Sequence, residues 1–174
     1  RGIVDPDVTT VLQEQFDLYN RKMMTHDDLA LAAGRIYAKA LIGKNYLTLR
    51  AEAALFIKKD FGSLLGPSLS LLSALADRHV EAIVISGAPS EVVQAYRESL
   101  RLGSVYGLEL ATNAGTYTGN VINNPGVAAE KRKIVSRILS DGSARVVLGM
   151  GNSHSDMPLF EAAPLSVLVG DIPL

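Results

Sequence analysis

Three groups of polar residues in the C-terminal half have types and positions suited to binding a phosphorylated ligand. The first is Ser86-Gly87, which follows the apolar run at residues 82–85 and precedes Pro89, a residue favoured at a helix start. A hydroxyl and a glycine at a helix N-terminus favour an anion, because free backbone N–H groups point out of the first helical turn. The same residues also fit a simple turn that caps a helix.

The second group follows another apolar run, residues 144–148, and supplies Asn152 and Asp156 as oxygen donors. Oxygen ligands in an open loop suit Mg²⁺, which keeps several waters and takes one or two carboxylates from a protein. The alternative is a helix cap made by Ser153 or Ser155.

The third group is the charged run Glu130-Lys131-Arg132-Lys133, at the start of the expected helix that precedes the second apolar run. One of its lysines can reach a bound phosphate as a point charge. A solvated helix face is the usual explanation of such a run, and it stays open here.

The elements that must position these groups follow from the hydrophobic pattern. Helical spacing predominates to about residue 80, with Thr25 as the N-cap of one helix. Short apolar runs then alternate with helical segments, which predicts parallel strands in a sheet with helices on both faces. The expected strands are at residues 82–85, 144–148 and 165–169, with a hairpin at 105–111 and 117–121. The expected helices after the first strand are at residues 90–102, 126–139 and 156–163.

Composition narrows the class of protein. The 174 residues are 48% hydrophobic with a formal net charge of −1, which fits one globular domain and gives no sign of the broad basic field of a nucleic-acid-binding protein. The absence of cysteine excludes disulfides, thiolate metal sites and a cysteine nucleophile, and fits a cytoplasmic protein. No apolar run approaches the roughly 20 residues that span a membrane. Because the chain opens with Arg1 and not with Met, we expect it to be part of a longer protein.

These residues, in this order, resemble the haloacid dehalogenase-like (HAD) hydrolase superfamily, and most closely its phosphoserine-phosphatase-like branch. Ser86 matches the family's phosphoryl-binding hydroxyl, and Lys131 matches its phosphate-stabilising lysine, with Lys133 second. Residues 151–156 match the metal-binding motif G-D-S-x-x-D, and the turn at residues 115–119 also resembles this branch.

The resemblance implies a Rossmann-like three-layer α/β core at residues 79–174 and a mostly helical cap region at residues 1–78. It makes Ser86 and Lys131 catalytic, and Asn152 and Asp156 ligands of Mg²⁺. Ser86, Gly87 and Arg35 would contact the substrate.

Two departures accompany the resemblance. Asn152 stands where the family usually has Asp, which removes one negative charge from the metal site. The catalytic motif D-x-D-x-T is matched literally by residues 5–9, but only Ile3 and Val4 precede it as a strand, and an Asp-Pro-Asp sequence is also an ordinary helix cap. We therefore expect the nucleophile and the first core strand to lie upstream of Arg1. A sheet without that strand has an open edge, which another copy of the chain can cover in a homo-oligomer.

The expected function is that of a Mg²⁺-dependent phosphomonoester hydrolase. It would act on a small phosphorylated metabolite through an aspartyl-phosphate, with neither nucleic acid nor membrane as a partner. The alternative is a catalytically degenerate HAD-like domain that acts as a binding or interaction module.

Overall fold

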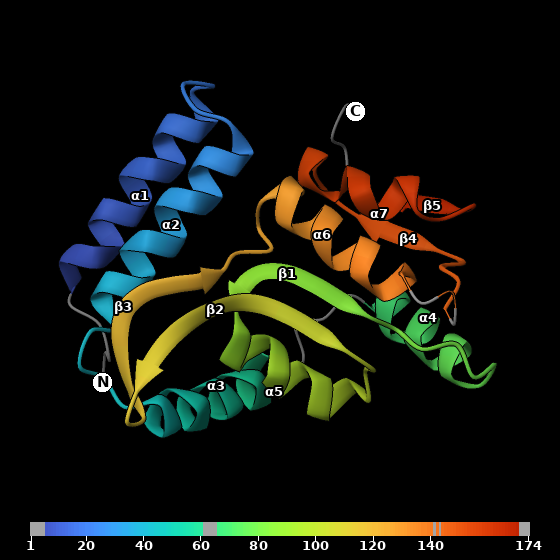
Figure 1. Ribbon diagram of the computed structural model, residues 1–174, viewed down its shortest axis with the longest axis horizontal. Coiled ribbons are helices and arrows are strands. Elements are labelled where there is room, and N and C mark those ends of the chain that lie inside the picture. Colours follow the sequence, from blue (N-terminus) through green and yellow to red (C-terminus); the bar gives the residue numbers. More distant parts are fainter. Residues whose placement is uncertain (1–5, 61–65, 141, 143, 171–174) are drawn as a thin grey trace.

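The computed structural model describes residues 6–60, 66–140, 142 and 144–170 (Figure 1). Four helices come first in the chain: α1 (Pro6–Asn20), α2 (His26–Ala40), α3 (Tyr46–Asp60) and α4 (Gly66–Ala76). Strands and helices then alternate: β1 (Val84–Pro89), α5 (Ser90–Leu100), β2 (Val105–Asn113), β3 (Thr116–Asn123), α6 (Ala128–Leu139), β4 (Gly149–Gly151), the 3-10 helix η2 (His154–Asp156), α7 (Met157–Glu161) and β5 (Ser166–Leu168). The predicted α/β fold is confirmed. None of the described helices is long and apolar enough to cross a membrane.

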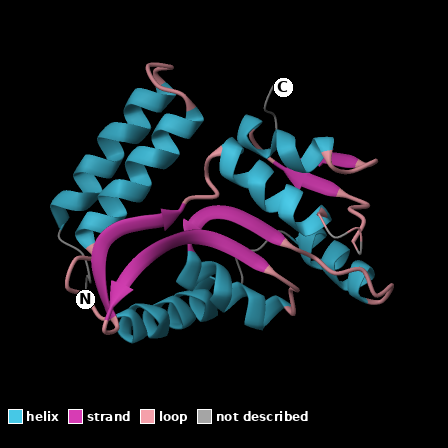
Figure 2. Ribbon diagram, in the orientation of Figure 1, coloured by secondary structure: helices cyan, strands magenta, loops and turns pink. Residues whose placement is uncertain are grey.

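The first sheet has the order β1-β2-β3 and lies between two layers of helices. Strand β1 pairs with β2 in parallel, and β2 pairs with β3 as an antiparallel hairpin, as the sequence predicts. Helix α2 packs on β3, while α5 packs on β1 and β2 and is itself covered by α3 (Figures 1 and 2). The cluster of buried residues at its centre comes from α2 and the hairpin: Ala38, Leu41, Leu108, Leu110 and Tyr117.

The second sheet is a short parallel pair, β4-β5, next to α6 and α7. The prediction of a strand at residues 144–148 was wrong: this apolar run has no regular structure, and the strand begins at Gly149. A strand needs a hydrogen-bonded partner along its length, and β5 pairs only with Gly149–Gly151. No strand among the described residues pairs with both β1 and β4, so the two sheets remain separate.

Helix α2 is fixed at both of its ends. Thr25 is its N-cap, and a capping box is formed because the Asp28 N–H donates to Thr25 Oγ1, 3.1 Å, while the Thr25 N–H donates to the Asp28 carboxylate. The chain leaves the helix through Gly43, whose φ of +75° favours glycine. The Asp27 carboxylate then accepts a hydrogen bond from the Ala128 N–H, 3.2 Å, and so connects the start of α2 to the start of α6.

Replacing Thr25 should therefore weaken the start of α2. We expect Thr25→Ala to lower the free energy of unfolding by about 1 kcal/mol, because the cap hydrogen bonds are lost while the helix face is unchanged. Urea unfolding measures this difference. Thr25→Ser is the matched control and should retain most of the stability, whereas an equal loss in both variants would contradict the capping role.

Candidate active site

A large cavity runs along β1, the irregular run at residues 144–148 and β4, and it includes the carboxyl end of β4, where parallel strands in α/β proteins present their ligands. Its volume is about 1120 Å³. Apolar residues of α2, α4 and α6 form much of its wall, together with the irregular run at residues 144–148. Its polar end brings together Ser86, Gly87, Lys131, Asn152 and Asp156, which are five of the six site residues predicted from the sequence.

Ser86 and Gly87 line this cavity from within β1, because the strand continues to Pro89 and does not end at residue 85 as the sequence predicts. The Ser86 Oγ accepts a hydrogen bond from the Ala88 N–H, 3.1 Å, which leaves its own O–H to donate to a ligand. Gly87 is needed for close backbone contact, because a Cβ at this position would lie 2.9 Å from the Gly126 Cα. This part of β1 can therefore offer the Ser86 hydroxyl to a ligand.

Lys131 and Asp156 form a buried ion pair at the cavity wall. Both residues are 5% exposed, and the Lys131 ammonium donates to Asp156 Oδ1 and, at 3.2 Å, to Ser155 Oγ. A lysine ammonium has three donors, so one remains for a ligand oxygen. Lys133, the second candidate, is instead exposed and bonded to Glu130, 2.6 Å.

The second oxygen of Asp156 organises the loop after β4. Asp156 Oδ2 accepts from the N–H groups of Asn152, 2.9 Å, and Ser153, 3.0 Å, and from the Ser153 hydroxyl, 3.0 Å. Burial raises the pKa of Asp156, but the hydrogen bonds from Lys131 and the Asn152 N–H lower it more, so the net pKa lies below the ordinary value. Asp156 is thus held as a carboxylate. Gly151 makes room for it, since a Cβ there would lie 2.4 Å from the Asp156 Cβ.

The remaining predicted residues lie elsewhere. Arg35 is exposed on α2 and is not among the residues that line the cavity, so its contact with substrate stays a prediction. Asp5 lies outside the described residues. Asp7 is exposed in the first turn of α1, and about 14 Å of helix axis separates it from Phe16, the α1 residue that lines the cavity.

His26 and Ser155 belong to the site, although the sequence did not single them out for it. His26 is the first residue of α2 and lines the cavity, and its buried Nδ1 has no hydrogen-bond partner in the described part of the chain. The sequence showed it only as part of a helix start. Ser155 is 2% exposed and accepts from Lys131, so it helps to hold the lysine in place.

The donor atoms present do not fit a magnesium ion by themselves. Among the described residues, no group of three or more His, Asp or Glu side chains could hold a metal. Both oxygens of Asp156 are already engaged, and Asn152 contributes only a neutral amide from an exposed position. Mg²⁺ takes one or two carboxylates from a protein, and Asp156, the carboxylate of this loop, has no oxygen without a hydrogen-bond donor.

Sequence comparison identifies the family to which this chain belongs. A sequence profile described as haloacid dehalogenase-like hydrolase matches residues 5–161. The chain therefore belongs to the haloacid dehalogenase-like hydrolase family, whose phosphatases in general use Mg²⁺. A search of curated proteins gives no match.

Solved structures show the same fold at low sequence identity. A protein of unknown function from Bordetella pertussis Tohama I has a TM-score of 0.73 at 17% identity, over 90% of this chain and 71% of that one. A phospho-aspartyl intermediate analogue of phosphoserine phosphatase gives 0.60 at 16% identity, over 90% and 71%. A probable phosphoserine phosphatase from Vibrio cholerae gives 0.63 at 17% identity, over 91% of this chain and 47% of that one.

Removing one partner of the buried Lys131–Asp156 pair should lower the stability of the fold. We expect Lys131→Met to lower the free energy of unfolding by about 3–5 kcal/mol at neutral pH, because Asp156 is left as an uncompensated buried carboxylate. The double variant Lys131→Met/Asp156→Asn should regain part of this loss. Urea unfolding of the three proteins measures both effects.

The pH dependence of stability is the control for this prediction. The folded-state pKa of Asp156 is lowered, so its contribution is complete above the unfolded-state pKa of about 3.9 and is lost as the pH falls through the folded-state pKa. The stability difference between the native chain and Lys131→Met should consequently narrow in acid. Equal stability of the two proteins at neutral pH would contradict the role of the ion pair.

Proposed function

We propose that this chain carries the phosphoryl-binding part of a phosphomonoester hydrolase that acts on a small phosphorylated metabolite. The observation that carries the proposal is that Ser86 and Lys131 line the same cavity, beside β1 and β4. Each group has a donor left for a phosphoryl oxygen, as argued above. Fixed donors that meet the negative charge of a transferring phosphoryl group are the main means of catalysing such a reaction.

The reaction proposed is attack by an aspartate carboxylate on phosphorus. An aspartyl-phosphate forms, the ester alcohol leaves with a proton, and water then hydrolyses the acyl phosphate to regenerate the carboxylate and release phosphate. Ser86 and Lys131 would hold the phosphoryl oxygens through both steps. His26, at the cap side of the cavity, would contact the part of the substrate beyond the phosphate.

We place the nucleophile in a segment that precedes Arg1 and lies as a strand between β1 and β4. Residues of both strands line the cavity, together with the irregular apolar run at residues 144–148. A strand inserted there would find hydrogen-bonding edges on either side. The competing candidate is Asp5, which is favoured by one observation: the family match begins at this residue.

We also propose roles for the two parts of the chain, the cap region at residues 1–78 and the core at residues 79–174. Residues 1–78 would form a helical cap that closes over the phosphate site and selects the substrate, and residues 79–174 the core. Phe16, His26 and Leu29 already line the cavity from the cap side. We propose a cytoplasmic protein, free or as a homo-oligomer, with neither nucleic acid nor membrane as a partner.

A second candidate function is a binding module that holds phosphorylated ligands without hydrolysing them. Asn152 favours it, because the loop after β4 has a neutral amide where a metal-binding carboxylate would be needed. The Lys131–Asp156 pair would then position an anion-binding donor and nothing more.

Phosphate release separates these possibilities. We expect this chain to hydrolyse neither p-nitrophenyl phosphate nor a panel of phosphorylated metabolites with Mg²⁺ present, and Asp5→Asn to change nothing. The protein with its upstream segment should hydrolyse a substrate, and Ser86→Ala should lower its kcat by about 10²–10³-fold through the loss of one phosphoryl donor. Lys131→Ala should have the same effect on the kcat of its folded fraction, which circular dichroism measures, because this variant also loses the buried ion pair.

Lys133→Ala is the matched control, because Lys133 is exposed and bonded to Glu130, and it should retain full turnover. Turnover by this chain that Asp5→Asn abolishes would overturn our placement of the nucleophile. Phosphate binding without turnover in the longer protein would favour the binding module.

Metal binding gives a second test. We expect Mg²⁺ at about 1 mM to raise the melting temperature of this chain no more than an ionic-strength-matched salt does, because a weakly bound ligand stabilises little. Asn152→Asp should increase the Mg²⁺ response by adding a carboxylate to the loop. Tight Mg²⁺ binding by the native chain would contradict the poor fit of its donor atoms.

A further inference from the structure

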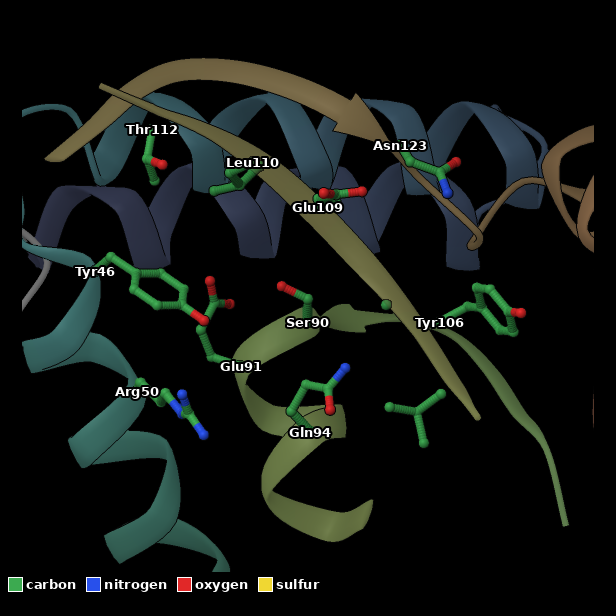
Figure 3. Close-up of a pocket in the computed structure, with 12 residues that line it drawn as sticks. Tyr46, Arg50, Ser90, Glu91, Gln94, Tyr106, Glu109, Leu110, Thr112 and Asn123 are labelled. Atoms are coloured by element: carbon green, nitrogen blue, oxygen red, sulfur yellow. The ribbon is translucent and has the colours of Figure 1, made fainter. Parts of the chain in front are cut away.

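A second cavity of about 470 Å³ lies against the first sheet, on the side of α3 and α5 (Figure 3). It has no lining residue in common with the cavity of the candidate active site. Its size is within the range of small-molecule sites. Most of the side chains that line it carry a polar group, which is unusual for an unfilled packing defect.

Glu91 lines this cavity and is the best buried of its acidic residues, with 4% of its surface exposed. One oxygen, Oε1, accepts a hydrogen bond from the Tyr117 hydroxyl. Burial, followed by the hydrogen bond to Glu91, raises the pKa of Tyr117, so this hydroxyl keeps its proton and donates. The other oxygen, Oε2, is buried and has no hydrogen-bond partner among the described residues.

A buried carboxylate oxygen without a donor is costly, because it has lost its hydration and gained nothing in exchange. Native proteins satisfy nearly all such groups, with protein atoms, water or a ligand. The Glu91 carboxylate lies beside the hydroxyl end of Tyr46, toward the cavity that Ser90 and Gln94 also line (Figure 3). The missing donor can therefore come from a molecule bound in this cavity.

The charges around the cavity favour a cationic donor. Glu109 adds a second carboxylate to the lining, whereas the one cation of the lining, Arg50, is bonded to Glu98 at 3.3 Å. Tyr46 and Tyr106 also line the cavity, and aromatic faces attract ammonium groups. An anionic ligand would meet two carboxylates here and would be disfavoured.

We propose that this cavity binds a small ligand that carries a protonated amine, with the ammonium group donating to Glu91. Glu109 would add long-range attraction at the more exposed side of the cavity, and Tyr46 would cover the apolar part of the ligand. The site is independent of the proposed hydrolase function. Ser90 and Glu91 nevertheless begin the helix that directly follows β1, so the ligand would bind only a few residues from the Ser86 hydroxyl.

Direct binding by this chain tests the proposal. Propylammonium chloride is the probe, 1-propanol is its uncharged counterpart, and potassium chloride controls for ionic strength. We expect propylammonium to raise the melting temperature in scanning calorimetry and to give saturable heats in titration calorimetry at millimolar concentrations. Propanol and potassium chloride should do neither.

Glu91→Gln is the decisive variant, because it keeps an oxygen that accepts from Tyr117 while removing the negative charge. We expect it to weaken propylammonium binding at least tenfold and to keep a folded circular dichroism spectrum. Glu52→Gln is the matched control: it removes one exposed carboxylate of α3 that lies outside the lining, and should leave binding unchanged.

Gln94→Arg supplies a second variant in case Glu91→Gln fails to fold. Gln94 is half-buried in the lining, and an added guanidinium would repel the ammonium and weaken binding tenfold or more. A propylammonium response no greater than that of potassium chloride would overturn the proposal. Binding that persists unchanged in the folded Glu91→Gln or Gln94→Arg protein would overturn it as well.

Discussion

The buried pair of Lys131 and Asp156 is the interaction on which the candidate active site depends. It joins the first turns of α6 to the loop after β4, two segments that meet only through tertiary packing. Asp156 uses one oxygen for the lysine and the other for the loop backbone, so a single carboxylate fixes both the ammonium and the loop. Burying two charges is tolerable here because nearly all of their hydrogen-bonding capacity is used. The site is therefore preorganised before any ligand arrives.

Residues whose role depends on local chain geometry were predictable from the sequence. Thr25 caps α2, and the turn between β2 and β3 falls at Gly115, because capping and turn formation need only neighbouring residues. Ser86 was singled out because it follows a buried apolar run, whereas Lys131 was chosen from its charged run only through the resemblance to the haloacid dehalogenase-like family. Their meeting at one cavity follows from the α/β topology.

The sequence did not predict the conformation or burial of residues that depend on partners far away in the chain. The apolar run at residues 144–148 has the composition of a strand, but a strand forms only where another strand offers its hydrogen-bonding edge. In the sequence, nothing distinguishes Glu91 from an ordinary acidic residue in a first helical turn. Its burial against Tyr117, 26 residues further along the chain, makes it unusual. His26 likewise entered the site only through the packing of α2 over the core.

One short stretch of backbone, from Ser86 within β1 to Glu91 in the first turn of α5, lines both cavities. Ser86 and Gly87 line the larger cavity, whereas Ser90 and Glu91 line the smaller one. The stretch has little freedom to adjust, because Gly87 is in backbone contact with Gly126 on one side, and a Cβ on Gly107 would lie 2.7 Å from the Ser90 Cα on the other. If a ligand displaced Glu91, the backbone between Glu91 and Ser86 would have to move as well. The close contacts of Gly87 and Gly107 oppose that movement.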